Sequence, residues 1–193
     1  MARKVTKWPP PEYDPVLADF GRIVFNFNVF EQHMRTILWC ILSEDQNDQK
    51  HYAINLNMDI RSIVDSIRTY AIEFCDGDKQ RSLIHCCDLF FSVKEYRDFY
   101  VNHLSGLVTN GTMELYVADA QPRITDYRKR ITEADVEWLQ QLCYVGSNYS
   151  AEVYGFVAEQ LGRLSGGDKP RDLPTPVPLP KKLDRQGIIR LKK

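Results

Sequence analysis

The strongest constraint on the fold is the spacing of apolar residues in four long segments that polar or glycine-containing breaks separate. Steps of three and four residues place side chains on one face of an α-helix. The sequence therefore predicts helices over residues 16–42, from Asn57 to about 74, from about 81 to 104, and from Thr132 to about 164. Apolar faces of this kind are buried when helices pack together, so we expect a mainly α fold, an antiparallel four-helix bundle.

Each predicted helix has one apolar face. In the first two helices its members are Val16, Phe20, Val24, Phe27, Met34 and Leu38, then Ile60, Ile63, Val64, Ile67, Tyr70, Ala71 and Phe74. In the last two they are Leu83, Cys86, Phe90, Val93, Val101 and Leu104, then Val136, Leu139, Leu142, Cys143, Tyr149, Val153, Phe156 and Val157. Asn57 is the expected N-cap of the second helix, and Thr132 with Asp135 resembles a capping box for the fourth.

The apolar period changes between the third and fourth helices. Asn110-Gly111 separates two short runs of β-favouring residues, and apolar and polar residues alternate over 113–117. Asn-Gly suits a type I′ turn because both central residues need a positive φ. The sequence therefore predicts a small β-hairpin here.

Two terminal segments flank the helical domain of residues 16–164. Residues 1–15 are proline-rich and predict an arm. Residues 165–193 form a proline-rich, basic tail, and Pro174, Pro176, Pro178 and Pro180 favour an extended polyproline conformation. No two of these prolines stand three apart, so the PxxP pattern is absent. The tail is either disordered by composition or a spacer whose last element, GIIRLKK, docks on a protein partner or an anionic surface.

Composition restricts the class of protein. The five cysteines are odd in number and contain no C-x-x-C pair, which predicts reduced thiols in a cytoplasmic protein and no zinc site. No apolar run is long enough to span a bilayer, so no membrane partner is expected. No metal-ligand set, glycine-rich phosphate loop or other cofactor signature occurs. Basic ends flank a strongly acidic body, which disfavours a general nucleic-acid-binding surface.

Two charged residues lie on apolar faces. Helical geometry places Arg97 within about 20° of Phe90 on the third helix, and Glu31 within about 20° of Phe20 on the first. A buried, unpaired guanidinium is costly, so we expect Glu31 and Arg97 to pair. Three readings remain open: a structural ion pair, an arginine that reaches water, or an arginine held by Glu31 at the edge of a pocket that faces a phosphate.

His103 follows Arg97 near the end of the third helix. On an ideal helix the two side chains point about 120° apart, but the length of the arginine or a loosened last turn before Ser105-Gly106 could bring them together. Asp98 or Asn102 could orient the imidazole. A histidine in this position is also often a polar surface residue or a helix cap.

The stretch R-D-F-Y-V-N-H, from Arg97 to His103, resembles the Arg-x5-His motif of the HEPN superfamily. Members of that superfamily are small helical bundles in which the arginine and histidine close a long helix. Asp98 matches a position that is commonly Asn, Asp or His, and Glu31 matches a glutamate on an early helix. The resemblance covers roughly residues 16–164.

This resemblance implies a metal-independent endoribonuclease that acts as a homodimer on RNA, with a toxin or antiviral defence role in many members. It implies that His103 is the general base or acid and that Arg97 stabilises the charge of the transition state. Asp98 or Asn102 would set the histidine tautomer, and Glu31 would support the site. Because many members are degenerate, the alternative is a non-catalytic helical scaffold or partner-binding module of the same fold.

Overall fold

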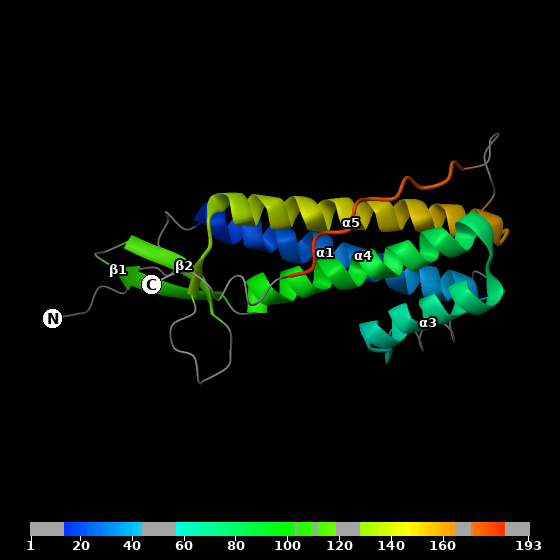
Figure 1. Ribbon diagram of the computed structural model, residues 1–193, viewed down its shortest axis with the longest axis horizontal. Coiled ribbons are helices and arrows are strands. Elements are labelled where there is room, and N and C mark those ends of the chain that lie inside the picture. Colours follow the sequence, from blue (N-terminus) through cyan, green and yellow to red (C-terminus); the bar gives the residue numbers. More distant parts are fainter. Residues whose placement is uncertain are drawn as a thin grey trace, which may run out of the picture.

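The computed structural model describes residues 14–43, 57–102, 104–109, 112–118, 128–164 and 171–183 (Figure 1). Its helices are α1 (Asp14–Leu42), α3 (Ile60–Phe74), α4 (Gly77–Asn102) and α5 (Glu133–Gln160). The expectation of a mainly helical bundle is confirmed. Among the described residues, no helix is both long enough and apolar enough to cross a bilayer.

The three long helices lie side by side, and the shorter α3 flanks α1 and α4 at one end (Figure 1). α1 and α5 run in the same direction: Phe30 lies against Gly146, and Cys40 shares a pocket with Tyr154. α4 runs in the opposite direction to both. The bundle therefore differs from the antiparallel arrangement that we expected.

A small sheet lies where α4 ends and α5 begins (Figure 1). Strand β1 (Leu104–Thr109) pairs antiparallel with β2 (Thr112–Ala118), and Thr109 is opposite Thr112. A third strand, β3 (Arg128–Arg130), pairs with β2, and the sequence analysis did not predict it. Asn110 and Gly111 lie outside the described residues, so the type I′ turn remains a prediction.

Aromatic rings from two helices form the centre of the core. The Phe90 ring of α4 lies with its centroid 5.4 Å from that of Phe27 and 5.1 Å from that of Phe30, both on α1. Gly146 brings α5 close to this cluster, because a Cβ built on it would lie 2.7 Å from Cε1 of Phe30. The glycine therefore permits a close approach of α1 and α5.

Several helix ends differ from those expected. The N-cap of α3 is Asp59 and not Asn57, since its carboxylate accepts a hydrogen bond of 3.0 Å from the Ser62 N–H. α4 begins at Gly77, four residues early, because the positive φ of 53° at this glycine turns the chain sharply after α3. It also ends two residues early, so that Leu104 belongs to β1.

The capping box at the start of α5 is confirmed. The Thr132 hydroxyl accepts a hydrogen bond from the Asp135 N–H, and the Asp135 carboxylate accepts one from the Thr132 N–H. Two reciprocal bonds thus satisfy backbone donors that the first turn leaves open.

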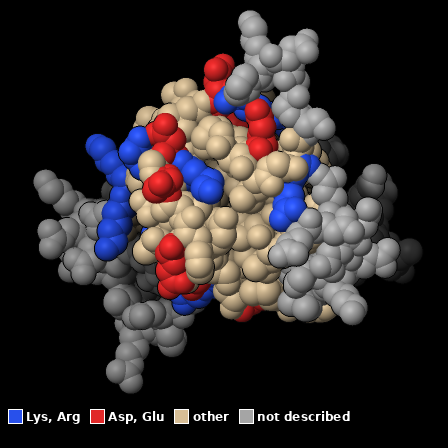
Figure 2. All heavy atoms as spheres, turned by 90° about the vertical axis from the view of Figure 1, so that its right-hand side faces the viewer, with Lys and Arg blue, Asp and Glu red and all other residues tan. Residues whose placement is uncertain are grey.

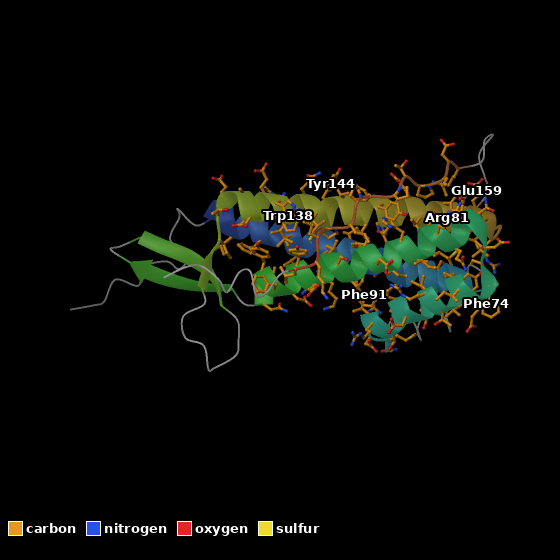
Figure 3. All side chains as sticks on the ribbon, viewed as in Figure 1. Phe74, Arg81, Phe91, Trp138, Tyr144 and Glu159 are labelled. Carbon is orange, nitrogen blue, oxygen red and sulfur yellow. The ribbon has the colours of Figure 1, made fainter. Side chains whose placement is uncertain are left out.

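Among the side chains that the structure describes, the apolar faces are largely those expected, with two exceptions. Val24 is 38% exposed and Phe74 is 69% exposed. On α1, burial follows Ile23, Phe30 and Ile37 instead, because this helix packs against α4 and α5 together. Phe74 is the last residue of α3 and points away from the core at the turn into α4 (Figure 3).

Residues 171–183, called the strap below, have neither helix nor strand structure. The strap runs beside α5 and then crosses onto α4 (Figure 1). Leu183, near its end, is buried in the core of the bundle. Residues 1–13 of the predicted arm and the GIIRLKK element lie outside the described residues, whereas Asp14 and Pro15, the end of that arm, belong to α1.

Candidate functional site

Arg97 lies in the last two turns of α4 and points into the interface with α1. The carbon at the centre of its guanidinium is 4.2 Å from the centroid of the Phe27 ring, which is a cation–π contact. Its positive charge also acts on Cys143 of α5, whose pKa burial raises to about 12 against the opposing effect of Arg97. The side chain is 21% exposed, so part of it reaches solvent. Arg97 is therefore half-buried between three helices, as the helical wheel predicted.

Asp98 is the carboxylate nearest to Arg97. Its Oδ1 lies 2.6 Å from Nη1 of Arg97, and its Oδ2 accepts a hydrogen bond from Nζ of Lys94. The Arg97 contact is an ion pair by distance but lacks the angles of a hydrogen bond, because adjacent residues on a helix point in different directions. Asp98 therefore lies between two cations and fixes the position of both.

The guanidinium of Arg97 keeps unused hydrogen-bonding capacity. Its Nε is buried, and no acceptor among the described residues lies in hydrogen-bonding position to it. The other N–H groups have no hydrogen bond to the described part of the chain either, since their contact with Asp98 is an ion pair only. A rigid, partly accessible guanidinium with open donors can bind a phosphate or carboxylate.

The expected pair between Glu31 and Arg97 is wrong. Glu31 instead accepts a hydrogen bond of 3.0 Å from Nη2 of Arg35, one turn later on α1. Nη1 of Arg35 donates to the Met58 carbonyl, also at 3.0 Å, and so joins α1 to the residues that precede α3. Glu31 therefore stabilises the α1–α3 junction. An (i, i+4) pair with the acid first is a signal that the sequence already contained.

The rest of the motif can be placed only in part. Asn102 is the last residue of α4, and its side chain is exposed. His103 lies outside the described residues, directly between the end of α4 and the start of β1. Whether His103 approaches Arg97 therefore stays a prediction.

Two other histidines, which the sequence left unassigned, make contacts between distant segments. Nδ1 of His33 donates to the Ser147 carbonyl at 3.1 Å and lies 2.9 Å from the Ser150 hydroxyl. Burial lowers the pKa of His33, and the hydrogen bond to Ser147 opposes that shift. His85 contacts the strap through Val177. Both imidazoles therefore have structural partners.

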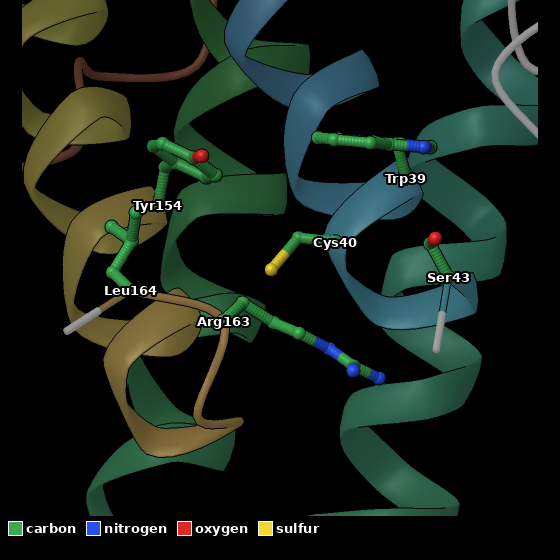
Figure 4. A pocket seen from close by; sticks show the side chains of 6 residues that line it. All are labelled: Trp39, Cys40, Ser43, Tyr154, Arg163 and Leu164. Atoms are coloured by element: carbon green, nitrogen blue, oxygen red, sulfur yellow. The ribbon is translucent and has the colours of Figure 1, made fainter. Parts of the chain in front are cut away.

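A cavity of about 80 Å³ lies at the other end of the bundle, where α1 and α5 end. Cys40 points into it between Tyr154 and Arg163, and Arg163 extends towards Ser43 (Figure 4). Burial raises the pKa of the Cys40 thiol, which makes it a poor nucleophile.

Charge and metal-binding groups are dispersed over the described part of the chain. At the end of the molecule shown in Figure 2, side chains of both signs surround an uncharged area. Groups of three or more His, Cys, Asp or Glu that could hold a metal ion do not occur among the residues that the structure describes. All five cysteines are free thiols, as the sequence predicted.

Comparison of the chain with protein-family models, with curated proteins and with solved structures finds no match. The Arg97 region is therefore interpreted from its own geometry and from the motif that the sequence carries.

Proposed function

We propose that this protein is a metal-independent endoribonuclease of the HEPN type, acting as a homodimer, with its site at the C-terminal end of α4. The observation that carries the proposal is the guanidinium of Arg97. It is held by Phe27 and Asp98, it has open donors, and it precedes His103 by six residues in the sequence. Such a group is suited to stabilise negative charge that develops on a phosphate.

In this proposal His103 removes the proton from a ribose 2′-hydroxyl, since an imidazole titrates near neutral pH. The 2′-oxygen then attacks the adjacent phosphorus, and the bond from phosphorus to the 5′-oxygen breaks. The leaving 5′-oxygen takes up a proton, so the products are a 2′,3′-cyclic phosphate and a 5′-hydroxyl. Arg97 stabilises the extra charge on the phosphorane-like transition state, and Asp98 keeps Arg97 in place. A toxin or defence role is the biological setting that the motif suggests.

A non-catalytic helical scaffold is the second candidate function. The Asp98 carboxylate favours it, because this group already forms ion pairs with both Arg97 and Lys94 within α4. The acidic body of the chain favours it too, because it repels an RNA backbone. In a scaffold, Arg97 would serve packing alone, and its stacking on Phe27 would be its whole role.

Arg97→Lys separates the two functions. Lysine keeps the charge but loses the planar fork that matches a phosphate. For a ribonuclease we expect cleavage of single-stranded RNA in EDTA to slow by about 10²-fold, as when one transition-state donor is lost. Arg22→Lys is the matched control, since Arg22 is an exposed arginine paired with Asp19 on α1, and it should cleave at the wild-type rate.

The free energy of unfolding of each variant should be measured beside the rate. If Arg97→Lys cleaves RNA slowly but is as stable as the wild type, the result supports a role of Arg97 in catalysis. If the folded wild-type protein cleaves no RNA and Arg97→Lys alters stability alone, the scaffold function replaces the ribonuclease.

A further inference from the structure

Burial along the strap repeats every three residues. Pro174 and Leu183 are buried, Val177 and Pro180 are half-buried, and the residues between them are exposed. A polyproline II helix has three residues per turn, so residues at this spacing form one ridge along it. The ridge faces the helices: Val177 and Leu183 pack against the core of the bundle.

Arg171 lies one step before Pro174 on the same ridge, and it fixes the start of the strap on α5. Its backbone N–H donates to the Glu159 carboxylate at 3.1 Å, and its Nε lies 3.7 Å from the same group. Its guanidinium lies against bare backbone, because a Cβ on Gly155 would be 2.8 Å from Nη1. Glu159 and Gly155 of α5 thus form a binding site for a cation at the start of the strap.

Two side chains of α4 bind backbone carbonyls of the strap. Nε2 of His85 donates to the Val177 carbonyl at 2.8 Å, and the Tyr96 hydroxyl donates to the Lys181 carbonyl at 2.6 Å. Polyproline backbone has no internal hydrogen bonds, so its carbonyls are free to accept. A ridge for packing and a donor for a carbonyl are the two elements by which proteins recognise proline-rich peptides.

The strap does not fill this surface. A pocket of about 380 Å³ remains beside its first half, between Arg81, His85 and Asp88 of α4 and the strap residues Pro174 and Pro176. Larger side chains than those of the strap could enter it. Arg81 and Glu159 mark this end of the groove in Figure 3.

We propose that the groove between α4 and α5 is a recognition site for an extended proline-rich peptide, and that the strap is its resident ligand. The partner is a segment of another protein with a basic residue first and proline or an aliphatic residue at each third position after it. Such a segment binds where the strap binds and displaces it. This inference does not depend on the ribonuclease proposal, because none of its residues belongs to the Arg97 site.

Tethering makes the strap a strong competitor. A ligand joined by a short linker has an effective concentration of about 1 mM, so a partner must bind more tightly than the strap or meet a strap that has lifted. The apparent affinity for a partner is its intrinsic affinity multiplied by the fraction of open grooves. A substitution that weakens the strap therefore strengthens binding of a peptide added in trans.

The test uses the full-length chain and a fluorescent peptide with the sequence of residues 171–183. Val177→Asp buries a charge on the ridge, and we expect the peptide to bind this variant about tenfold more tightly than the wild type, by fluorescence anisotropy. Thr175→Asp adds the same charge at an exposed position between ridge residues and should leave binding at the wild-type level. Adding Tyr96→Phe to Val177→Asp should weaken peptide binding severalfold, because the groove then loses one donor.

Circular dichroism shows whether each variant keeps its helices. If Val177→Asp unfolds, Val177→Ser replaces it, since serine removes the packing and adds no charge. Equal peptide binding by the wild type and the folded ridge variant would overturn the proposal. So would equal gains from Val177→Asp and Thr175→Asp, because binding would then not depend on the ridge.

Discussion

At the scale of single residues, Gly146 and Gly21 provide a matched pair of glycines in helices. A methyl group on Gly146 would meet the Phe30 ring, whereas one on Gly21 would have nothing within 4 Å. We expect Gly146→Ala to lower the free energy of unfolding by about 1–3 kcal/mol, the usual cost of overpacking. We expect Gly21→Ala to raise it by about 0.5–1 kcal/mol, because alanine restricts the unfolded chain and favours helix.

Urea denaturation of the two variants measures both effects. Similar stability changes in the two proteins would mean that α1 and α5 do not approach closely at Gly146.

His33 predicts how stability depends on pH. Its pKa is lower in the folded protein than the ordinary value of 6.5, so the unfolded chain binds a proton more readily. The contribution of neutral His33 to the free energy of unfolding is therefore fully present above pH 6.5. It is lost as the pH falls through the pKa of His33 in the folded protein. We expect denaturation curves at pH 7.5 and 5.5 to differ more for the wild type than for His33→Asn, whose amide can still donate to Ser147. An equal difference in the two proteins would contradict this assignment.

The sequence predicted the position of Arg97 but not its partner. The helical wheel gives the direction of a side chain, so it correctly placed Arg97 on the buried face. It does not give the distance between helices, and thus could not show that Glu31 is held elsewhere. The (i, i+4) spacing of opposite charges was enough to predict both Glu31–Arg35 and Lys94–Asp98, since each pair lies within one helix.

At the scale of elements, the start of α5 depends on its capping box. Thr132→Ala removes the acceptor for the Asp135 N–H, and we expect it to lower the free energy of unfolding by about 1 kcal/mol. Thr132→Ser keeps the hydroxyl and should cost much less. Thermal melts of the two variants compare them, and identical midpoints would show that the cap contributes nothing.

The strap shows what the proline pattern alone could not predict. Spacing among the prolines gives no pair three apart, because Val177 occupies the position between Pro174 and Pro180. The three-residue period is visible only when aliphatic residues are counted with the prolines. Even then, the ridge meets a groove that α4 forms with α5, and α4 is far from the strap in sequence.

At the scale of the whole molecule, one aromatic cluster joins α1 to α4. Phe90 contacts both Phe27 and Phe30, and all three are fully buried. We expect Phe90→Ala to lower the free energy of unfolding by about 3–5 kcal/mol, the usual cost of truncating a buried aromatic residue. Phe25 is 67% exposed, so Phe25→Ala should change it by less than about 0.5 kcal/mol. If guanidinium denaturation showed similar losses in the free energy of unfolding for Phe90→Ala and Phe25→Ala, the core would not be centred on Phe90.

The helical class of the molecule could be predicted because each apolar face is a local pattern. The relative direction of the helices could not, since it depends on long connections whose path the apolar period does not encode. β3 was missed for a similar reason: three residues of basic sequence carry no alternation, and their pairing with β2 is a tertiary contact.

The most direct test of the central claim is RNA cleavage by the purified protein in EDTA, comparing wild type with His103→Ala. We expect the wild type to cut single-stranded RNA and to leave 2′,3′-cyclic phosphate ends, and we expect no cleavage by the folded variant. Cleavage by both proteins at one rate, or by neither when both are folded, would contradict it.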